Sequence, residues 1–265
     1  MEHFLRIAFS TICILAIQPA YAGNSLREKR IADVLEKHIV VGEVKWLEAK
    51  GEPFLTIFTE TERNSKQGVI ILHGMGGHPN WTQVIYPLRT QLTEFGWSTL
   101  SIQTPLLASS AGYADYLDIV TEISPRIEAA IQFYKSMGVE DIFVVGHSLG
   151  ATMAMYYFST LTKKTELRGL ITISLSGQKR DNFEPLKLLE KVQSPMLDLY
   201  GGFDLPRVKN TLRARKLAAT RGENTGYQQS EIPEADHFYR GTEAAMVKKI
   251  RGWMRSILKN MGRTP

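Results

Sequence analysis

The chain has 265 residues, of which 43% are hydrophobic and 22% charged, with 21 Gly and 11 Pro. This composition is typical of a globular protein and excludes collagen-like, disulfide-rich and intrinsically disordered classes. The length is enough to bury one sizeable core and is compatible with one or two domains. The formal net charge at pH 7 is +5. In a chain of 265 residues such a small excess of positive charge is only weak support for an acidic partner.

The N-terminal segment has the pattern of a secretory signal peptide. Residues 4–17 are an apolar run with one early basic residue, Arg6, and residues 20–22 read Ala-Tyr-Ala, a small-x-small cleavage site. We therefore predict a signal peptide at residues 1–22, cleavage after Ala22, and a periplasmic or secreted protein. The alternative is an uncleaved anchor, but a spanning helix needs about 20 apolar residues and this run is shorter. No stable membrane anchor is expected after cleavage.

The single cysteine, Cys13, lies inside this predicted signal. The residues directly before it, 10–12, lack the small residue that a lipoprotein signal requires, so lipid attachment is not expected. Removal of residues 1–22 from the 265-residue chain leaves 243 residues without a cysteine. A disulfide, a thiolate metal site and a cysteine nucleophile are then all excluded, which suits an oxidising compartment.

The remaining residues predict alternating strands and helices. An amphipathic helix at 24–37 precedes two β-rich runs, which a short turn joins as a hairpin. Continuous apolar runs, typical of strands buried on both faces, then alternate with helical periodicities. The predicted strands are 43–49, 54–59, 69–72, 98–102, 142–145, 170–175, 196–200 and 227–232, and the later helices are 84–95, 120–134, 153–161 and 247–258.

This alternation predicts an α/β fold in one domain, residues 23–265. The expected architecture is a mainly parallel sheet of about eight strands with helices on both faces. The N-terminal antiparallel hairpin extends the sheet at one edge. Pro87 is expected in the first turn of its helix, and Pro125 is expected to kink or restart the helix at 120–134.

The sharpest local motif is at residues 146–150, which read Gly-His-Ser-Leu-Gly directly after a predicted strand and before a helix. A serine hydroxyl is a weak nucleophile, so an enzyme must present it on a tight turn where a base can reach it. Glycines on either side of Ser148 remove Cβ atoms that would clash with this turn and with neighbouring strands. The strand-turn-helix context makes Ser148 a candidate nucleophile.

Through this motif, and through residues 73–77 (His-Gly-Met-Gly-Gly), the chain resembles the α/β-hydrolase superfamily. In that superfamily, the loop after the third strand supplies one oxyanion donor and the residue after the nucleophile supplies the other. The resemblance therefore implies that the backbone N–H groups of Met75 and Leu149 form the oxyanion hole. Residues 73–103 also resemble a secreted bacterial hydrolase-fold family whose members are mostly of unknown function, which indicates architecture and no substrate.

A serine triad of this fold needs an acid and then a histidine downstream of the serine. Asp204 directly follows a buried strand, where a loop can place a carboxylate over the sheet edge. Asp198 lies within that strand and Asp181 follows the preceding strand, and both are weaker candidates. His237 lies between a β-like run and the last helix, where the superfamily resemblance places the catalytic histidine.

The other histidines have simpler interpretations. His73 is expected to brace the oxyanion loop by hydrogen bonding, and His147 is the variable residue of the serine motif. His78 borders the oxyanion loop and contacts either substrate or solvent, His38 precedes the core, and His3 lies in the signal.

Metal and nucleic-acid functions have little support. Asp236 beside His237 lacks the spacing of a known metal motif, so neither a metal nor another cofactor is expected. A basic run follows the candidate acid, but a solvated helix face explains it better than nucleic-acid binding, because it lacks interleaved aromatics and a recognition motif. The run comprises Arg207, Lys209, Arg213, Arg215, Lys216 and Arg221.

The short segment between two predicted strands limits the size of a lid over the site. Many lipases and esterases of this fold insert a helical lid after the sixth strand, but residues 177–194 leave room for only one short helix, at 183–192. We expect little or no lid and therefore a small or exposed acyl substrate. Residues 104–116, rich in small and apolar side chains, are a candidate for the acyl pocket from their position, and individual substrate-binding residues are not assigned.

The sequence thus predicts a secreted or periplasmic serine hydrolase that acts on a small-molecule acyl substrate, with a carboxylic ester expected. Ser148 is the nucleophile, His237 the base and Asp204 the orienting acid. Amidase, peptidase and thioesterase activities would use the same groups. A catalytically silent protein that binds a ligand or an envelope partner is the alternative from another class. The oligomeric state is not predicted.

Overall fold

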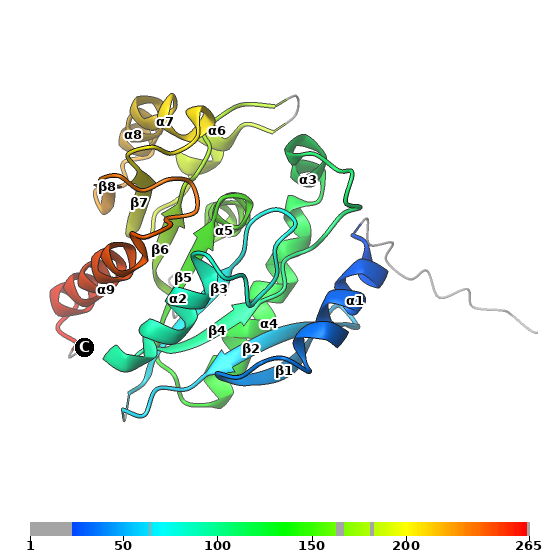
Figure 1. Cartoon of the computed structure of the whole chain (residues 1–265). Coiled ribbons are helices and arrows are strands. Elements are labelled where there is room, and N and C mark those ends of the chain that lie inside the picture. Colours follow the sequence, from blue (N-terminus) through cyan, green and yellow to red (C-terminus); the bar gives the residue numbers. More distant parts are fainter. Residues whose placement is uncertain (1–22, 64, 163–166, 181–182, 264–265) are drawn as a thin grey trace, which may run out of the picture.

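A computed structural model describes residues 23–63, 65–162, 167–180 and 183–263. The predicted signal peptide at residues 1–22 lies outside this range. Figure 1 shows one central sheet with helices packed on both of its faces. No helix in the described residues combines the length and apolarity needed to cross a membrane.

The sheet has eight strands in the order β1-β2-β4-β3-β5-β6-β7-β8. The pairs β1/β2 and β2/β4 are antiparallel, and all other neighbours are parallel. The predicted α/β architecture, with an antiparallel hairpin at one edge, is confirmed. The strands are β1 (Glu43–Ala49), β2 (Glu52–Thr59), β3 (Gln67–Leu72), β4 (Ser98–Ile102), β5 (Asp141–His147), β6 (Leu167–Ile173), β7 (Met196–Gly201) and β8 (Tyr227–Ile232).

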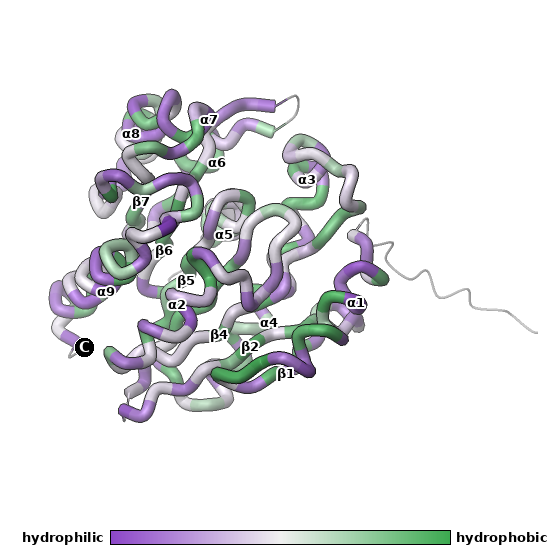
Figure 2. Tube along the Cα trace, in the orientation of Figure 1, coloured by the Kyte–Doolittle hydropathy of each residue, from purple (hydrophilic) through white to green (hydrophobic). Residues whose placement is uncertain are grey.

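The inner strands β3, β4 and β5 are buried along their whole length because each one meets a helical layer on both faces. In β3, Val69 and Ile71 pack into the core beneath α2 (Ile85–Gln91) and α9 (Glu243–Asn260). The alternate residues Ile70 and Leu72 pack into the core on the opposite face. In Figure 2, α9 alternates in hydropathy along its length, as expected for a helix with one face on the sheet.

The second face of the sheet is covered mainly by α4 (Ile123–Ser136), α5 (Leu149–Thr160), α6 (Pro185–Leu189) and α8 (Leu212–Arg221). The first helix, α1 (Ser25–Leu35), packs on β2 through Ala32 and Leu35. Short elements complete the fold: η1 (Thr93–Phe95), α3 (Tyr113–Asp118), η2 (Val120–Glu122) and α7 (Pro206–Lys209).

The helices differ from the predictions mainly in length. The predicted helix 84–95 is α2 followed by a separate 3-10 turn, η1. The predicted helix 120–134 divides into η2 and α4, and Pro125 lies in the first turn of α4, where its missing N–H costs no hydrogen bond. The predicted helix 183–192 is the shorter α6, which begins at Pro185.

The prediction that the basic run forms a solvated helix face is wrong at Arg215, whose side chain is fully buried. Helix α8 packs this face over the sheet, and the guanidinium Nε lies 2.8 Å from Oδ2 of Asp198 in β7. Nη1 of the same arginine donates to the Val208 carbonyl at 2.8 Å. The carboxylate and the carbonyl therefore solvate this charge in place of water.

The strand order creates a switch point beside β3, because the chain moves from β3 to β4 on one side and continues with β5 on the other. In open α/β sheets, ligands bind beyond the carboxyl ends of the strands at such a point. Between β6 and β7, the described residues 174–180 and 183–195 form one short helix, α6, which packs against α5 and α8. The predicted fold with little or no lid is therefore confirmed.

Candidate active site

Ser148 lies on a strained turn between the last residue of β5 and the first residue of α5. Its backbone has φ 54° and ψ −112°, a conformation that non-glycine residues rarely adopt. A Cβ on Gly146 would lie 2.3 Å from the Gly150 carbonyl oxygen, and a Cβ on Gly150 would lie 2.5 Å from the carbonyl oxygens of Leu72 and His73. The first glycine therefore permits the turn itself, and the second permits contact with the end of β3.

The structure brings Ser148, His237 and Asp204 together in one hydrogen-bonded series. His237 Nε2 lies 3.1 Å from the serine Oγ, and His237 Nδ1 lies 2.7 Å from Asp204 Oδ1. Since a carboxylate only accepts, the Nδ1 atom carries the proton and Nε2 is free to accept the serine proton. Of the two weaker acid candidates, Asp198 is bound to Arg215, and Asp181 lies outside the described residues.

The Asp204 carboxylate is held in place by donors other than His237. The Ser174 hydroxyl donates to Oδ2 at 2.5 Å, and the backbone N–H groups of Gly201 and Leu205 donate to Oδ2 and Oδ1 at 3.2 and 2.8 Å. Burial alone would raise the pKa of this carboxyl, but the hydrogen bonds from His237, Ser174 and Gly201 hold it below its usual value. Asp204 therefore remains ionised at neutral pH.

His147, treated as a variable position in the sequence, contacts the loop of the candidate base. Its Nε2–H donates to the backbone carbonyl of His237 at 2.9 Å, and the two rings lie 5.1 Å apart. Burial, assisted by His237, lowers the pKa of His147 to about 4, so the ring is neutral at pH 7. This hydrogen bond links the end of β5 to the loop after β8. The two residues are far apart in the sequence, so the hydrophobic periodicity of the sequence does not predict their contact.

The predicted oxyanion donors lie on both sides of the switch point. Met75 is a central residue of a turn closed by the Gly77 N–H and the Gly74 carbonyl at 3.1 Å, so this turn does not use its N–H. A Cβ on Gly74 would lie 3.4 Å from the Ser148 Cβ, which places the turn against the nucleophile. Leu149 is the first residue of α5, so its N–H has no acceptor within the helix.

His73 braces this oxyanion loop, as its sequence position predicted. Its Nδ1–H donates to the Gly74 carbonyl at 2.9 Å, and its Nε2 accepts the Thr104 N–H at 3.0 Å. Burial lowers the pKa of His73 to about 3, which fixes the neutral ring that this pair of bonds requires. The β3 and β4 loops are thereby connected behind Met75.

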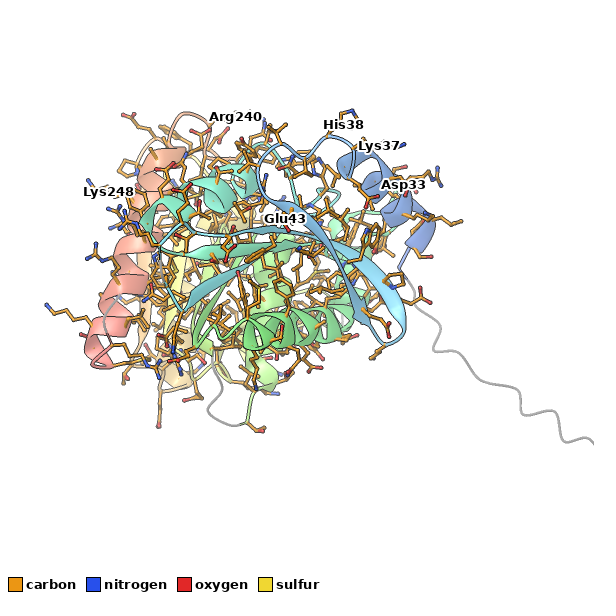
Figure 3. The ribbon with its side chains drawn as sticks, turned by 90° about the horizontal axis from the view of Figure 1, so that it is seen from below. Asp33, Lys37, His38, Glu43, Arg240 and Lys248 are labelled. Atoms are coloured by element: carbon orange, nitrogen blue, oxygen red, sulfur yellow. The ribbon has the colours of Figure 1, made fainter. Side chains whose placement is uncertain are left out.

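The remaining predicted positions are peripheral. His78 Nδ1 accepts the Asn80 N–H at 3.2 Å, and Figure 3 shows His38 at the molecular surface beside Lys37. His3 lies outside the described residues. Asp236 accepts the N–H groups of Phe238 and Arg240 within its own loop. Nowhere in the described ranges do three His, Cys, Asp or Glu side chains form a group that could hold a metal ion.

The predicted acyl-pocket segment, 104–116, extends from β4 into α3. The Tyr113 hydroxyl shares a hydrogen bond of 2.8 Å with the Thr152 hydroxyl in the first turns of α5. The Thr152 N–H donates to the Ser148 carbonyl at 3.2 Å. The segment therefore reaches the helix that begins at the candidate nucleophile.

Solved structures with this fold include several hydrolases. Est1E from Butyrivibrio proteoclasticus superposes with a TM-score of 0.65 at 16% identity and covers 82% of this chain and 99% of its own. An α/β serine hydrolase homologue from Coxiella burnetii gives 0.64 at 17% identity, with coverage of 83% and 99%. XC6422 from Xanthomonas campestris, described as an α/β serine hydrolase without a lid, gives 0.62 at 16% identity, with coverage of 86% and 98%.

At these identities the likeness shows the fold, which is that of the α/β hydrolases. A comparison with curated proteins finds no match to this chain. A family model matches residues 16–116 and 108–256, which is most of the sequence. The chain therefore belongs to the family described as protein of unknown function, DUF3530.

Proposed function

We propose that this protein is a serine hydrolase that cleaves carboxylic esters through an acyl-enzyme on Ser148. The observation that carries the proposal is the series from Asp204 through His237 to Ser148, with contacts of 2.7 and 3.1 Å. An acid, a neutral imidazole and a serine in this order are the groups needed to activate a hydroxyl for acyl transfer. The low pKa of Asp204 supports the role of an ionised orienting acid.

In this mechanism the Ser148 oxygen attacks the ester carbonyl carbon while His237 Nε2 takes the serine proton. Asp204 stabilises the resulting imidazolium through Nδ1–H, and the backbone N–H groups of Met75 and Leu149 bind the new oxyanion. Collapse of the tetrahedral intermediate breaks the bond to the leaving alkoxide, which receives the proton from His237. Water then attacks the acyl-enzyme by the same steps and releases the carboxylic acid and free serine.

The absence of a large lid favours small or exposed acyl substrates, because the described residues between β6 and β7 form just the short helix α6. Amides, peptides and thioesters would react through the same groups. Matched butyryl substrates with 4-nitrophenol, 4-nitroaniline and thiophenol leaving groups separate these activities. A kcat/KM highest for the oxygen ester, after correction for leaving-group reactivity, supports the assignment.

The experiment that tests the function is labelling with a fluorophosphonate probe, which reacts covalently with an activated serine. We expect labelling of the wild type and none of Ser148→Ala. Ser256→Ala, on the exposed side of α9, is the matched control and should label fully. Folded wild-type protein that resists the probe would instead support the alternative of a silent binding protein.

We also propose that the protein is periplasmic or secreted after cleavage behind Ala22. The arrangement around Gly23, which would become the first residue, supports this proposal. A Cβ on Gly23 would lie 3.1 Å from a carboxylate oxygen of Glu122, so a terminal ammonium on this residue would lie near a negative charge. N-terminal sequencing of the exported protein should begin Gly-Asn-Ser-Leu. Recovery with an intact N-terminus would contradict it.

A further inference from the structure

Two segments flank α5 at the carboxyl end of the sheet. Figure 1 shows α3 on one side of this end and α6 and α7 on the other. From α3, Tyr113 reaches Thr152 through the 2.8 Å hydroxyl contact, and Thr152 bonds to the Ser148 carbonyl one helical turn back. Tyr113 is thereby fixed close to the candidate nucleophile.

From α7, the guanidinium of Arg207 lies over the Tyr113 ring, with its central carbon 5.5 Å from the ring centroid. Arg207 follows Asp204 by three residues, and its backbone carbonyl accepts hydrogen bonds from the hydroxyls of Ser176 and Thr211 at 3.2 and 3.1 Å. The backbone of Arg207 is therefore anchored beside the loop that follows β6, and its side chain rests on an aromatic face.

The Arg207 charge has no acidic partner in the described part of the chain. Two other arginines of this region have acidic partners, Arg215 with Asp198 and Arg221 with Glu190, whereas the exposed Arg180 and Arg213 form no ion pair among the described residues. Arg207 is only half-buried, and no ion pair or side-chain hydrogen bond of its guanidinium occurs among the described residues. A positioned, partly dehydrated guanidinium without an internal carboxylate is suited to bind an external one.

The electrostatic effects of Arg207 agree with this position. Burial accounts for most of the lowered pKa of His147, and the positive charge of Arg207 adds to it. Burial raises the pKa of Tyr113, and the charges of Arg207 and Arg180 partly oppose that rise. Two cations thus lie near the rim between Tyr113 and the triad, and the field there favours an anion.

We propose that Arg207 forms an anion subsite that binds a second carboxylate of the substrate, so that the preferred substrates are half-esters of dicarboxylic acids. The proposal rests on the hydrolase function proposed above. A guanidinium edge presents two parallel N–H donors, which match the two oxygens of a carboxylate. Arg180, exposed on the neighbouring loop, adds positive charge at the outer side of the subsite.

The test compares anionic and neutral esters of the same length. The substrates are mono(4-nitrophenyl) adipate and mono(4-nitrophenyl) suberate, each against its methyl-capped diester. The wild type should favour the free acid by about tenfold in kcat/KM for the length that spans the two groups, since a charge-assisted hydrogen bond is stronger than a neutral one and partial exposure weakens it. In Arg207→Gln the ratio should fall to about one.

Three further variants sharpen the result. Arg207→Lys keeps the charge without the two-donor edge and should retain part of the preference. Arg180→Gln should lower the ratio by a smaller factor than Arg207→Gln. Arg213→Gln removes one exposed charge from the neighbouring α8 and should leave the ratio unchanged, which separates a bound carboxylate from general attraction.

The inference would be overturned by a wild type that hydrolyses the neutral esters as fast as the acids, or by an Arg207→Gln ratio equal to that of the wild type. Equal losses of the acid preference in Arg207→Gln and Arg213→Gln would likewise overturn it, because the preference would then come from the general positive charge of this surface. Thermal unfolding checks that the variants fold. Fluorophosphonate labelling separates the two proposals: a protein that labels but shows no acid preference retains the hydrolase function without the subsite.

Discussion

His147 Nε2–H donates to the backbone carbonyl of His237 at 2.9 Å, so the residue before the candidate nucleophile holds the residue that carries the candidate base. The imidazole of His237 has its own contacts to Ser148 and Asp204. Loss of the His147 bond would leave those groups in place but free the loop that aligns them.

We therefore predict that His147→Ala lowers kcat by about 10- to 100-fold, because small displacements of reacting groups have effects of this size. His147→Gln should lose less, since its amide can still donate to the carbonyl. Kinetics with 4-nitrophenyl butyrate measure the effect, and His38→Ala at the surface is the control. Equal activity of wild type and His147→Ala would show that the loop is positioned without this bond.

Ser174 gives a second prediction through its 2.5 Å bond to Asp204. Ser174→Ala removes a donor that favours the ionised carboxylate, so the pKa of Asp204 rises towards its usual value. The activity loss should be modest at pH 8 and larger at pH 4, close to the usual carboxyl pKa of 3.8, where a substantial fraction of the acid is protonated in the variant. The pH profile of kcat/KM relative to the wild type tests this. Asp204→Asn should lose about 10⁴-fold at all pH values, and a parallel drop for Ser174→Ala at pH 4 and 8 would contradict the titration argument.

The Arg215–Asp198 pair predicts a stability effect. Both side chains are fully buried, and the Tyr227 hydroxyl and the Gln229 amide also donate to Asp198. Asp198→Asn leaves the buried guanidinium without its countercharge and should lower the free energy of unfolding by about 3–5 kcal/mol.

The matched control for this effect is the partly exposed pair Arg221–Glu190. Arg221→Gln should cost about 0–1 kcal/mol, the usual range for surface pairs. Urea unfolding measures both variants. Similar losses in Asp198→Asn and Arg221→Gln would mean that the buried pair is relaxed by water or by its other donors.

Two glycine-to-alanine changes should have opposite signs. A Cβ on Gly150 would lie 2.5 Å from two backbone carbonyl oxygens of β3 and its loop, so Gly150→Ala must displace the serine turn. Gly252 lies in α9 with nothing within 4 Å of its Cβ position, and Gly252→Ala should stabilise the protein by about 0.8–1 kcal/mol. Thermal unfolding of both variants checks the pair, and a Gly150→Ala protein with wild-type stability and activity would refute the close-packing argument.

The sequence predicted the sheet and the site because both depend on local patterns. The apolar run before Ser148 and the glycines around it specify a strand, a turn and a helix within about ten residues of sequence. Asp204 and His237 each follow a strand, in the order that the fold requires. The assignment of Met75 and Leu149 as oxyanion donors came instead from the resemblance to the α/β-hydrolase superfamily and remains a prediction.

The contacts that the sequence did not predict are those between distant segments. The residues of α8 are mostly charged or small, so nothing in their spacing shows that Arg215 turns inward to meet Asp198 in β7. Likewise, His147 and Ser174 form hydrogen bonds to His237 and Asp204, which lie in loops much later in the sequence. Such polar pairs become visible only when the order of the strands in space is known.

The buried neutral histidines predict how stability depends on pH. His73 and His147 have pKa values of about 3 and about 4 in the folded protein, against about 6.5 in an unfolded chain. Between these limits the unfolded state binds protons that the folded state does not, so the free energy of unfolding falls as pH decreases. Each group contributes a slope of at most about 1.4 kcal/mol per pH unit, fully developed below pH 6.

Urea unfolding at pH 7.5, 6.5, 5.5 and 4.5 measures this slope above the range in which Asp204 protonates. His73→Gln removes one of these two groups and should reduce the slope between pH 6 and 4.5 by at most about 1.4 kcal/mol per pH unit, whatever its effect on stability at pH 7.5. A slope that stays the same in His73→Gln would mean that His73 is protonated to the same extent in the folded and unfolded states. That outcome would contradict the argument from its complete burial and from the hydrogen bond that its ring accepts from the Thr104 N–H.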